Sequence, residues 1–315
     1  MTDVKDLYDA VIIGGGPAGL TAALYLARAR YRVLVVEKDH FGGQITITNE
    51  VVNYPGVFST SGSELSETMR KQAEAFGAEF LLAEVTDLDM SGDVKVVHTT
   101  KGERPCLSVL LATGAHPRHI GFVGEEDYQG HGVAYCATCD GMFYRGKQVF
   151  VIGGGNTAVE ESQFLARFAD KVTLIVRKDH LRANATAIKQ FEENPKTEIR
   201  YLTSITAVDG NDLLTSITFR NNQTGEEHTE TFDEGSFGVF VLVGRVPSTE
   251  LLTDLVDLDE QGYVLADERM ATKTPGLFTA GDLNKKPLRQ IITAAADGAI
   301  AATSVASYLG QPVEG

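Results

Sequence analysis

Two distant stretches of the chain repeat one pattern of hydrophobic and polar positions. Each opens with a short run of mostly β-branched residues, passes through a cluster of glycines, and continues with apolar residues at helical spacing. A second β-branched run closes each copy, at residues 33–36 in the first and at 172–176 in the second. Strand, glycine turn, helix and strand in this order predict a βαβ unit of a parallel, doubly wound sheet in each copy.

The remaining hydrophobic pattern predicts how the two units are connected. Alternating apolar residues with turn signals over 80–111 predict a meander in the first domain, while a final strand and helix over 276–309 have no strand–helix partner of their own. We therefore assign this tail to the first domain. The sequence predicts an α/β protein with two Rossmann-like domains built on parallel sheets, each with a small antiparallel β-meander. The domains are residues 1–118 with 248–315, and residues 119–247 inserted between them.

Composition and charge narrow the classes of function. A chain of 315 residues, 43% hydrophobic and 23% charged, has an ordinary globular composition and the length of about two domains. The net charge of −15 argues against nucleic-acid binding, because phosphates attract basic surfaces. The first residues lack the pattern of a signal peptide, and no uninterrupted apolar run reaches the length of a membrane span. We therefore expect a cytoplasmic protein that does not contact a membrane.

The first glycine cluster has the spacing of a dinucleotide-binding turn. Gly14, Gly16 and Gly19 follow a predicted strand and, with Pro17 and Ala18 between them, open a predicted helix. This spacing allows a tight turn and close approach of a pyrophosphate, and the free N–H groups at the start of the helix face the phosphates.

An acidic residue strengthens this prediction. Glu37 ends the next strand, where a carboxylate accepts hydrogen bonds from an adenosine ribose and repels a 2′-phosphate. The alternative is a glycine turn with a purely structural role.

The second glycine cluster repeats the turn with a different charge beside it. Gly153 and Gly155 are followed by Asn156, Thr157 and Ala158 at the start of the next predicted helix. No acid ends the strand after this helix, and the basic residues that follow it suit a 2′-phosphate, which favours NADP over NAD. These basic residues are Arg177, Lys178 and Arg182. The alternative is an ordinary charged start of a helix.

A pair of cysteines lies between the two glycine clusters. Cys136 and Cys139 are separated by two residues and followed at once by Asp140. One lone C-x-x-C in a cytosolic chain indicates redox chemistry, and no second cluster of ligands is present for a metal. Asp140 could exchange a proton with the thiols, or could cap a helix. Cys106 lies in a strand-like run and is predicted to be a buried bystander.

The segment Cys-Ala-Thr-Cys-Asp-Gly, followed by the glycine turn, resembles the low-molecular-weight bacterial thioredoxin reductases. The resemblance extends over nearly the whole chain, through Gly-Gly-Gln at 42–44, Asn-Tyr-Pro-Gly at 53–56, Ala-Thr-Gly-Ala at 112–115 and Thr-Pro-Gly-Leu-Phe-Thr-Ala-Gly-Asp at 274–282. It implies FAD in the first domain, NADPH in the second, and electron transfer through Cys136 and Cys139 to oxidised thioredoxin. It also implies a homodimer and a rotation between domains, for which Pro117 and Pro247 at the crossings would serve as hinges.

The resemblance also implies which residues contact the flavin besides the first glycine turn and Glu37. Among them Asp282 would bond the ribityl chain, and Arg289 and Gln290 would reach the flavin from the final helix. The full set is Lys38, Gly43, Gln44, Asn53, Val85, Ala112, Thr113, Gly114, Gly281, Asp282, Arg289 and Gln290.

One segment departs from the pattern of the family. The family's His-Arg-Arg-x-x-x-Arg reads Val176-Arg177-Lys178-x-x-x-Arg182 here. Lysine lacks the planar fork of arginine, so we expect weaker discrimination between NADPH and NADH, with NADH also acting as a donor.

Three other functions remain open at this point. A thioredoxin reductase that takes electrons from ferredoxin would have degraded both the glycine turn and the basic segment. The reductase of an alkyl-hydroperoxide system would carry an extra thioredoxin-like domain at its N-terminus. A non-catalytic flavin redox sensor would bind the same cofactor without steady turnover. The intact glycine turn and the early first strand favour the thioredoxin reductase that uses a pyridine nucleotide.

Overall fold

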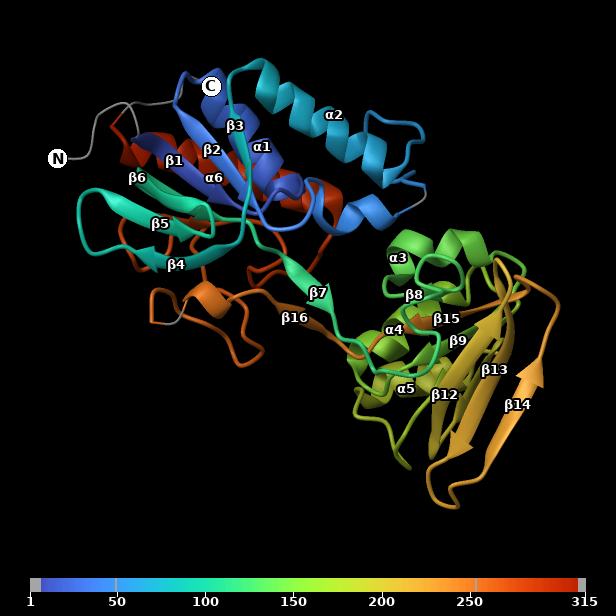
Figure 1. Ribbon diagram of the computed structural model, residues 1–315. Helices are drawn as coiled ribbons and strands as arrows, with labels where there is room; N and C mark the ends of the chain where they lie inside the picture. Colours follow the sequence, from blue (N-terminus) through green and yellow to red (C-terminus); the bar gives the residue numbers. More distant parts are fainter. Residues whose placement is uncertain (1–6, 49, 253, 311–315) are drawn as a thin grey trace. The chain divides into compact units, whose positions relative to one another are not determined.

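The computed structural model describes residues 7–48, 50–252 and 254–310. The chain forms two compact units, one built from residues up to His116 together with those from Val246 onward, and the other from Pro117–Arg245. The chain crosses between them twice, and the crossing segments β7 (Ala115–Pro117) and β16 (Arg245–Pro247) pair with each other (Figure 1). Each unit is described below by itself.

The first unit is built on a sheet in the order β3-β2-β1-β6-β5-β4, with β17 paired to β6. Strands β3, β2, β1, β6 and β17 are parallel, whereas β5 pairs antiparallel with β6, and β4 pairs antiparallel with β5. The strands are β1 (Tyr8–Ile13), β2 (Val33–Glu37), β3 (Glu79–Leu82), β4 (Val85–Asp89), β5 (Lys95–Thr99), β6 (Gly102–Leu111) and β17 (Leu277–Thr279). The helices are α1 (Pro17–Arg28), η2 (Gly43–Ile47), α2 (Gly62–Ala75), η4 (Glu250–Leu252) and α6 (Ile291–Tyr308).

Small residues let α1 and α6 pack closely on one face of this sheet (Figure 1). A methyl group at Gly298 of α6 would lie 2.2 Å from the carbonyl oxygen of Ala18 of α1, so only glycine fits there. Among the described residues, α6 is also the one helix whose length and composition would suit a membrane span, a test that core helices of soluble proteins often pass. Its buried alanines, including Ala301 and Ala302, belong to the core that α6 shares with α1.

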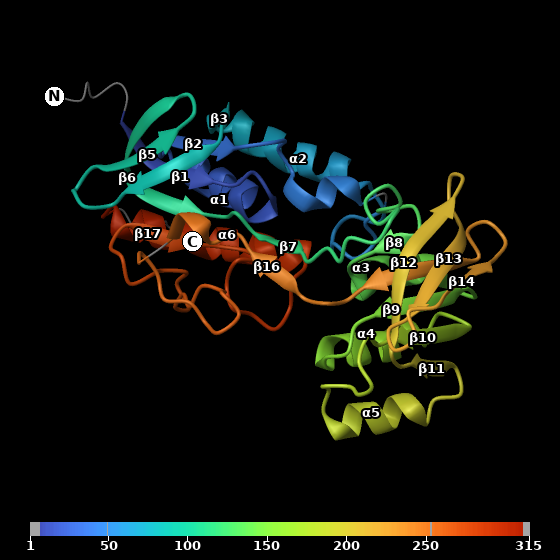
Figure 2. The same ribbon diagram turned by 60° about the horizontal axis from the view of Figure 1, so that its bottom comes forward.

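The second unit has three layers, with helices on one face of a parallel sheet and a three-stranded antiparallel sheet on the other (Figure 2). The parallel sheet has the order β11-β10-β9-β15-β8, and the antiparallel sheet the order β12-β13-β14. The strands are β8 (Val133–Ala134), β9 (Gln148–Ile152), β10 (Lys171–Ile175), β11 (Thr197–Arg200), β12 (Thr203–Gly210), β13 (Leu214–Asn221), β14 (Glu227–Thr231) and β15 (Phe237–Val241). The helices are α3 (Ala137–Asp140), η3 (Gly141–Tyr144), α4 (Asn156–Leu165) and α5 (Ala185–Glu192).

Aromatic residues join the two sheets of this unit. Phe150 of β9 packs against Phe219 of β13 and Phe237 of β15, with ring centroids 5.3 and 5.8 Å apart. The opposite face of the parallel sheet packs against the helices through Leu165 of α4 and Phe191 of α5, both fully buried. Because both faces are covered, the central strands are apolar throughout rather than alternating.

The predicted fold class is confirmed, with one difference at β3. The apolar run beginning at Phe80 was expected to start the meander, but β3 pairs in parallel with β2 and only β4, β5 and β6 form the antiparallel part. Helix α2 precedes β3, and a crossover through a helix returns a strand parallel to the strand before it. Alternation of residues in so short a strand does not distinguish the two directions.

Candidate functional site

The first glycine turn lies between β1 and α1 and leaves no room for side chains at two of its glycines. Gly14 has φ +109°, and a methyl group on it would lie 2.3 Å from the carbonyl oxygen of Ala112. A methyl group on Gly19 would lie 2.0 Å from the carbonyl oxygen of Gly14. Gly16 differs, because a methyl group on it would meet no atom within 4 Å. Gly16 is also the N-cap of α1, and no side chain caps this helix end. The turn therefore presents open space beside free helix N–H groups, a shape that fits a pyrophosphate.

Glu37 at the end of β2 folds back onto this turn. Its carboxylate accepts hydrogen bonds from the N–H groups of Gly15 at 2.7 Å and of Lys38 at 2.8 Å. The Lys38 side chain itself is exposed. The carboxylate is thus fixed at the end of the turn, where it fits the ribose of a dinucleotide.

Segments that are far apart in the sequence converge on the same turn. A methyl group on Gly281 would lie 2.9 Å from Cβ of Ala18, and the Cα atom of Gly16 would lie 3.2 Å from a methyl group on Gly43. The C-terminal segment is thereby brought against the start of α1. The structure therefore brings Gly43 and Gly281, two of the predicted flavin residues, against the turn that contains Gly16 and Ala18.

Hydrogen bonds hold four further predicted flavin residues, Gln44, Asn53, Arg289 and Gln290. The Asn53 amide donates to Oε1 of Gln290 at 3.1 Å, across most of the chain. The Arg289 guanidinium donates to the carbonyl oxygen of Asp282 at 3.2 Å, and the Gln44 amide donates to that of Ala115 at 2.5 Å.

Ala112, Thr113 and Gly114 connect the end of β6 to the crossing segment. The backbone of Ala112 abuts Gly14, as described above, and the Thr113 hydroxyl donates to the carbonyl oxygen of Ser248 at 2.7 Å. The carbonyl oxygen of Gly114 accepts from the N–H of Ser248 at 3.0 Å. Val85 begins β4 and packs against the core on the other side of the sheet, so its contact with a flavin stays a prediction.

The second glycine turn lies between β9 and α4 and has the same shape as the first. A methyl group on Gly153 would lie 2.4 Å from Cβ of Ala158 and 2.7 Å from the carbonyl oxygen of Leu242. Gly155, the N-cap of α4, has nothing within 4 Å in its side-chain direction. The first two residues of α4, Asn156 and Thr157, are exposed at the mouth of the turn.

The predicted basic segment lies next to this second turn. The N–H of Arg182 donates to the carbonyl oxygen of Gly154 at 2.7 Å, which draws the segment after β10 back to the glycines. The side chains of Arg177, Lys178 and Arg182 are all exposed. An exposed basic segment beside a glycine turn is suited to an additional phosphate.

The two cysteines form a disulfide on the short helix α3. Their Cα atoms are 5.3 Å apart, and Cys136 is the N-cap of the helix, with Sγ accepting the N–H of Cys139 at 3.2 Å. The neighbouring first-turn N–H, that of Ala137, donates to Oε2 of Glu161 on α4 at 3.2 Å. The redox pair and the second glycine turn therefore belong to one unit and are linked by α4, which begins at that turn.

Asp140 follows the disulfide and is partly buried. Burial raises the pKa of its carboxyl from the usual 3.8 to about 6, because desolvation disfavours the charged form. Burial, with the Asp140 charge as a smaller cause, likewise raises the pKa of the Tyr144 hydroxyl. A carboxyl that titrates near neutral pH beside a dithiol is suited to proton exchange. Cys136 is the N-cap of α3. Asp140 occupies the N-cap position of η3, but its side chain makes no capping hydrogen bond there.

Sequence reasoning missed two acids near these sites, the buried Asp297 and the partly buried Glu161. Asp297 on α6 accepts the N–H of Gly281 at 3.0 Å and forms a close ion pair with Lys286, which anchors the loop that carries Asp282. A lone acid within an apolar helix is a signal that could have revealed it. Glu161 is the other, and nothing in its sequence context distinguishes it from the exposed Glu160 beside it.

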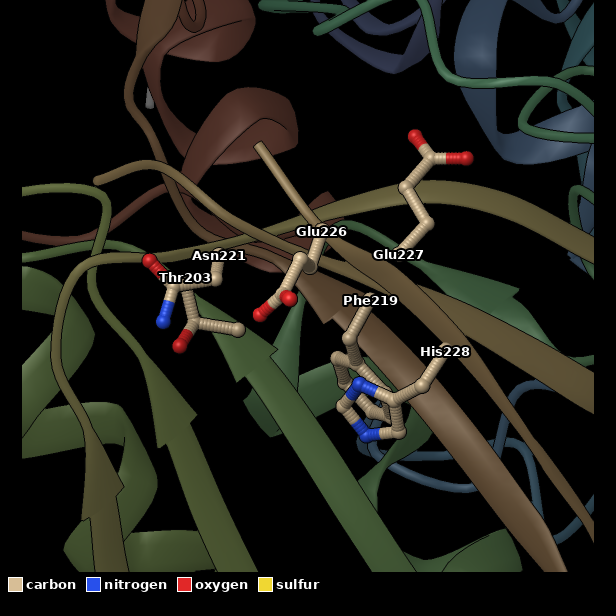
Figure 3. Close-up of a pocket in the computed structure, with 6 residues that line it drawn as sticks. All are labelled: Thr203, Phe219, Asn221, Glu226, Glu227 and His228. Carbon is tan, nitrogen blue, oxygen red and sulfur yellow. The ribbon is translucent and has the colours of Figure 1, made fainter. Parts of the chain in front are cut away.

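The structure also contains two surface hollows, one that includes none of the predicted site residues and one that includes Arg289. The first is on the antiparallel sheet of the second unit, where the His228 ring stacks on Phe219 with centroids 5.4 Å apart (Figure 3). Its lining residues are Thr203, Phe219, Asn221, Glu226, Glu227 and His228, none of which belongs to the predicted sites. The second is in the first unit and includes Arg289, whose guanidinium carbon lies 3.9 Å from the centroid of the Tyr263 ring. Within the described residues no group of three or more His, Cys, Asp or Glu side chains could hold a metal ion.

Comparison with known proteins agrees with this geometry. Residues 8–298 match the family described as pyridine nucleotide-disulphide oxidoreductase. The chain is 45% identical to a thioredoxin reductase of Peptoclostridium acidaminophilum over 97% of its length and 98% of that protein. It is 40% identical to the thioredoxin reductase of Bacillus subtilis, covering 98% of this chain and 96% of the other.

Solved structures give the same result. The crystal structure of thioredoxin reductase from Streptococcus pyogenes superposes with a TM-score of 0.91 at 40% identity, covering 96% of this chain and 98% of the other. The resemblance to thioredoxin reductases inferred from the sequence is confirmed, and so is the predicted enzyme class of disulfide oxidoreductase. The chain belongs to the pyridine nucleotide-disulphide oxidoreductase family.

Proposed function

We propose that this protein is a thioredoxin reductase that transfers electrons from NADPH through FAD and the Cys136–Cys139 pair to oxidised thioredoxin. The observation that carries the proposal is the disulfide on α3, held within the same unit as a second dinucleotide turn. FAD is assigned to the first unit and NADPH to the second. The names of the relatives support the same substrate and enzyme class.

The first unit binds FAD through residues that leave space and donate hydrogen bonds. Gly16 leaves room for the pyrophosphate at the N-terminus of α1, and Glu37 accepts hydrogen bonds from the adenosine ribose. Asp282 and Gln290 lie on the loop and helix start that Asp297 and Asn53 hold in place. When bound, FAD supplies the step between a two-electron donor and a disulfide, which no side chain can perform.

The dithiol passes the electrons on by thiol–disulfide exchange. Two electrons and two protons convert the Cys136–Cys139 disulfide into two thiols. One thiolate then attacks a sulfur of the thioredoxin disulfide and forms a mixed disulfide, and the other cysteine attacks that bond. The enzyme disulfide forms again, and thioredoxin leaves with two thiols. Asp140, with a pKa raised by burial to about 6, accepts or supplies a proton in this exchange.

The basic segment decides the electron donor. Arg177 and Arg182 favour the 2′-phosphate of NADPH, whereas Val176 and Lys178 replace two groups of the family's pattern. NADPH is therefore the better donor and NADH a weaker one. A donor such as ferredoxin is not favoured, because the second glycine turn retains its open shape at Gly155.

The remaining parts of the proposal concern assembly and location. We propose a homodimer that works in the cytoplasm, on the resemblance to the family. The net charge of −15 continues to argue against a nucleic-acid partner.

An anaerobic titration tests the proposal. The purified protein should show flavin absorbance, bleach on addition of NADPH, and bleach more slowly with NADH. A coupled assay with NADPH, thioredoxin and a chromogenic disulfide should then show steady turnover. A protein that bleaches but does not turn over would be a redox sensor, and one that neither nucleotide bleaches would point to ferredoxin as donor.

A further inference from the structure

Glu161 links the helix after the second glycine turn to the helix that carries the disulfide. It lies on α4, and its Oε2 atom accepts the N–H of Ala137, the first residue of α3, at 3.2 Å. Ala137 is fully buried and belongs to the hydrophobic core of this unit. The carboxylate of Glu161 is therefore held against the first turn of α3 beside Cys136.

Two N–H groups of this first turn have different acceptors, one a sulfur and the other a carboxylate. The N–H of Cys139 points to Sγ of Cys136 at 3.2 Å, an arrangement that stabilises a thiolate at that sulfur once the disulfide is reduced. The N–H of Ala137 is taken by Glu161. An anion held beside a thiol has the opposite effect from an N–H donor, because like charges disfavour each other.

Other charged and titratable groups also face this turn. Asp140 and Tyr144 follow the cysteines, Glu160 precedes Glu161 on α4, and Arg245 of β16 acts on the Glu161 charge. Burial raises the pKa of Glu161, while the Ala137 N–H and Arg245 favour its ionised form. Glu161 is joined directly to the backbone of α3, because it accepts the hydrogen bond from the Ala137 N–H.

We infer that Glu161 is a positioning residue of the dithiol, which fixes the first turn of α3 and whose negative charge disfavours the thiolate of the neighbouring cysteine. This inference deepens the proposed function, on which its meaning for turnover rests. Glu161 thereby limits how readily the reduced pair reacts at pH values where its carboxylate is ionised. The same residue ties the position of the cysteines to the helix that begins at the nucleotide turn.

The test measures the reactivity of the reduced cysteines directly. The full-length protein is reduced with dithiothreitol, freed of reductant, and alkylated with iodoacetamide at a series of pH values. Cys106 does not interfere, because it is fully buried and burial raises its pKa to about 12. Below pH ~9 the alkylation rate therefore reports on Cys136 and Cys139 alone.

Two glutamine variants make the test specific. Glu161→Gln keeps an acceptor for the Ala137 N–H but removes the charge, so the apparent pKa of the faster thiol should fall by about half to one unit. Glu160→Gln removes the same charge from an exposed position on the same helix, where solvent screens it, and should shift that value by less than ~0.2 units. Glu161→Ala also loses the acceptor for the Ala137 N–H. It should likewise lower the apparent pKa of the faster thiol, and the backbone amides of α3 should exchange their hydrogens faster than in the wild type.

The outcomes separate this inference from the proposed function. Identical alkylation profiles for the wild type and Glu161→Gln, or equal shifts in both glutamine variants, would overturn the role of Glu161. The alkylation needs neither flavin, nucleotide nor thioredoxin. A shifted profile in a protein that does not reduce thioredoxin would therefore overturn the proposed function and leave the inference standing.

Discussion

Tyr135, the residue immediately before Cys136 of the disulfide, donates its hydroxyl hydrogen to Oε1 of the buried Glu125 at 2.9 Å. The same carboxylate accepts the N–H groups of Ile120 at 3.0 Å and Gly121 at 2.6 Å. His119 Nδ1 lies 3.1 Å from the Tyr135 hydroxyl oxygen. One buried acid thus ties the segment at the start of the second unit to the segment that leads into the disulfide.

We expect Glu125→Ala to lower the free energy of unfolding by about 3 kcal/mol, because it leaves three donors without their acceptor. Tyr135→Phe removes one donor and should cost about 1 kcal/mol. Urea denaturation measures both, and Glu126→Ala, at an exposed neighbouring position, should change the value by less than ~0.5 kcal/mol. Equal losses for Glu125→Ala and Glu126→Ala would show that the cluster adds no stability.

The glycines of the first turn give a matched pair for flavin binding. In Gly16→Val the Cβ atom of the new side chain meets nothing within 4 Å, so the protein should fold normally but bind FAD at least about tenfold more weakly. Gly14→Val clashes with Ala112 at a φ of +109° and should lose stability as well. Flavin absorbance and fluorescence titration of the apoprotein measure the affinity. Normal FAD binding by a folded Gly16→Val protein would mean that the pyrophosphate lies elsewhere.

The cysteines should act only after the flavin. We expect Cys136→Ser and Cys139→Ser each to abolish reduction of thioredoxin while NADPH still bleaches the flavin, because the dithiol is the exit for electrons and the second glycine turn the entrance. Single-turnover bleaching under anaerobic conditions is the measurement, and Cys106→Ser is the control at a buried free thiol. Loss of bleaching in the two serine variants would assign the cysteines a structural or nucleotide-binding role.

Asp140 should make the protein less stable at neutral pH than in mild acid. Its pKa is raised from 3.8 to about 6 by burial, so the folded state holds a proton that the unfolded state has lost. The stabilisation is complete below pH ~4 and is lost as the pH rises through ~6, with a total of up to about 3 kcal/mol. Asp140→Asn should therefore be more stable than the wild type at pH 7 and equal to it below pH 4. Denaturant midpoints at both pH values measure this, and a constant difference between the two proteins would contradict it.

Arg182 should distinguish the two nucleotides. A charge-assisted hydrogen bond to a phosphate contributes roughly 1.5–3 kcal/mol, or one to two decades in affinity. Arg182→Ala should therefore raise KM for NADPH at least about tenfold and change KM for NADH little, since NADH lacks the 2′-phosphate. Arg220→Ala, at an exposed position on β13, is the control. Equal effects of Arg182→Ala on both nucleotides would place its side chain away from the 2′ position.

Local patterns were sufficient to predict much of this protein. The two strand–glycine–helix repeats, the acid at Glu37, the basic segment after β10 and the C-x-x-C pair are all short-range features, and each is formed by residues close in the chain. A positive φ, such as that of Gly14, and the alternation or continuity of apolar residues depend on a few neighbouring residues, so the sequence shows them directly.

Tertiary structure decided which distant groups meet. Asn53 bonds to Gln290, Asp297 accepts the N–H of Gly281, and Glu161 accepts the N–H of Ala137. The local sequence around these acids and amides does not predict which residues they contact. The direction of β3 was likewise set by the helix before it rather than by its own residues. Burial of a polar group depends on the packing of the whole domain, and so the raised pKa of Asp140 and the satisfied carboxylate of Glu125 emerge only when the chain is folded.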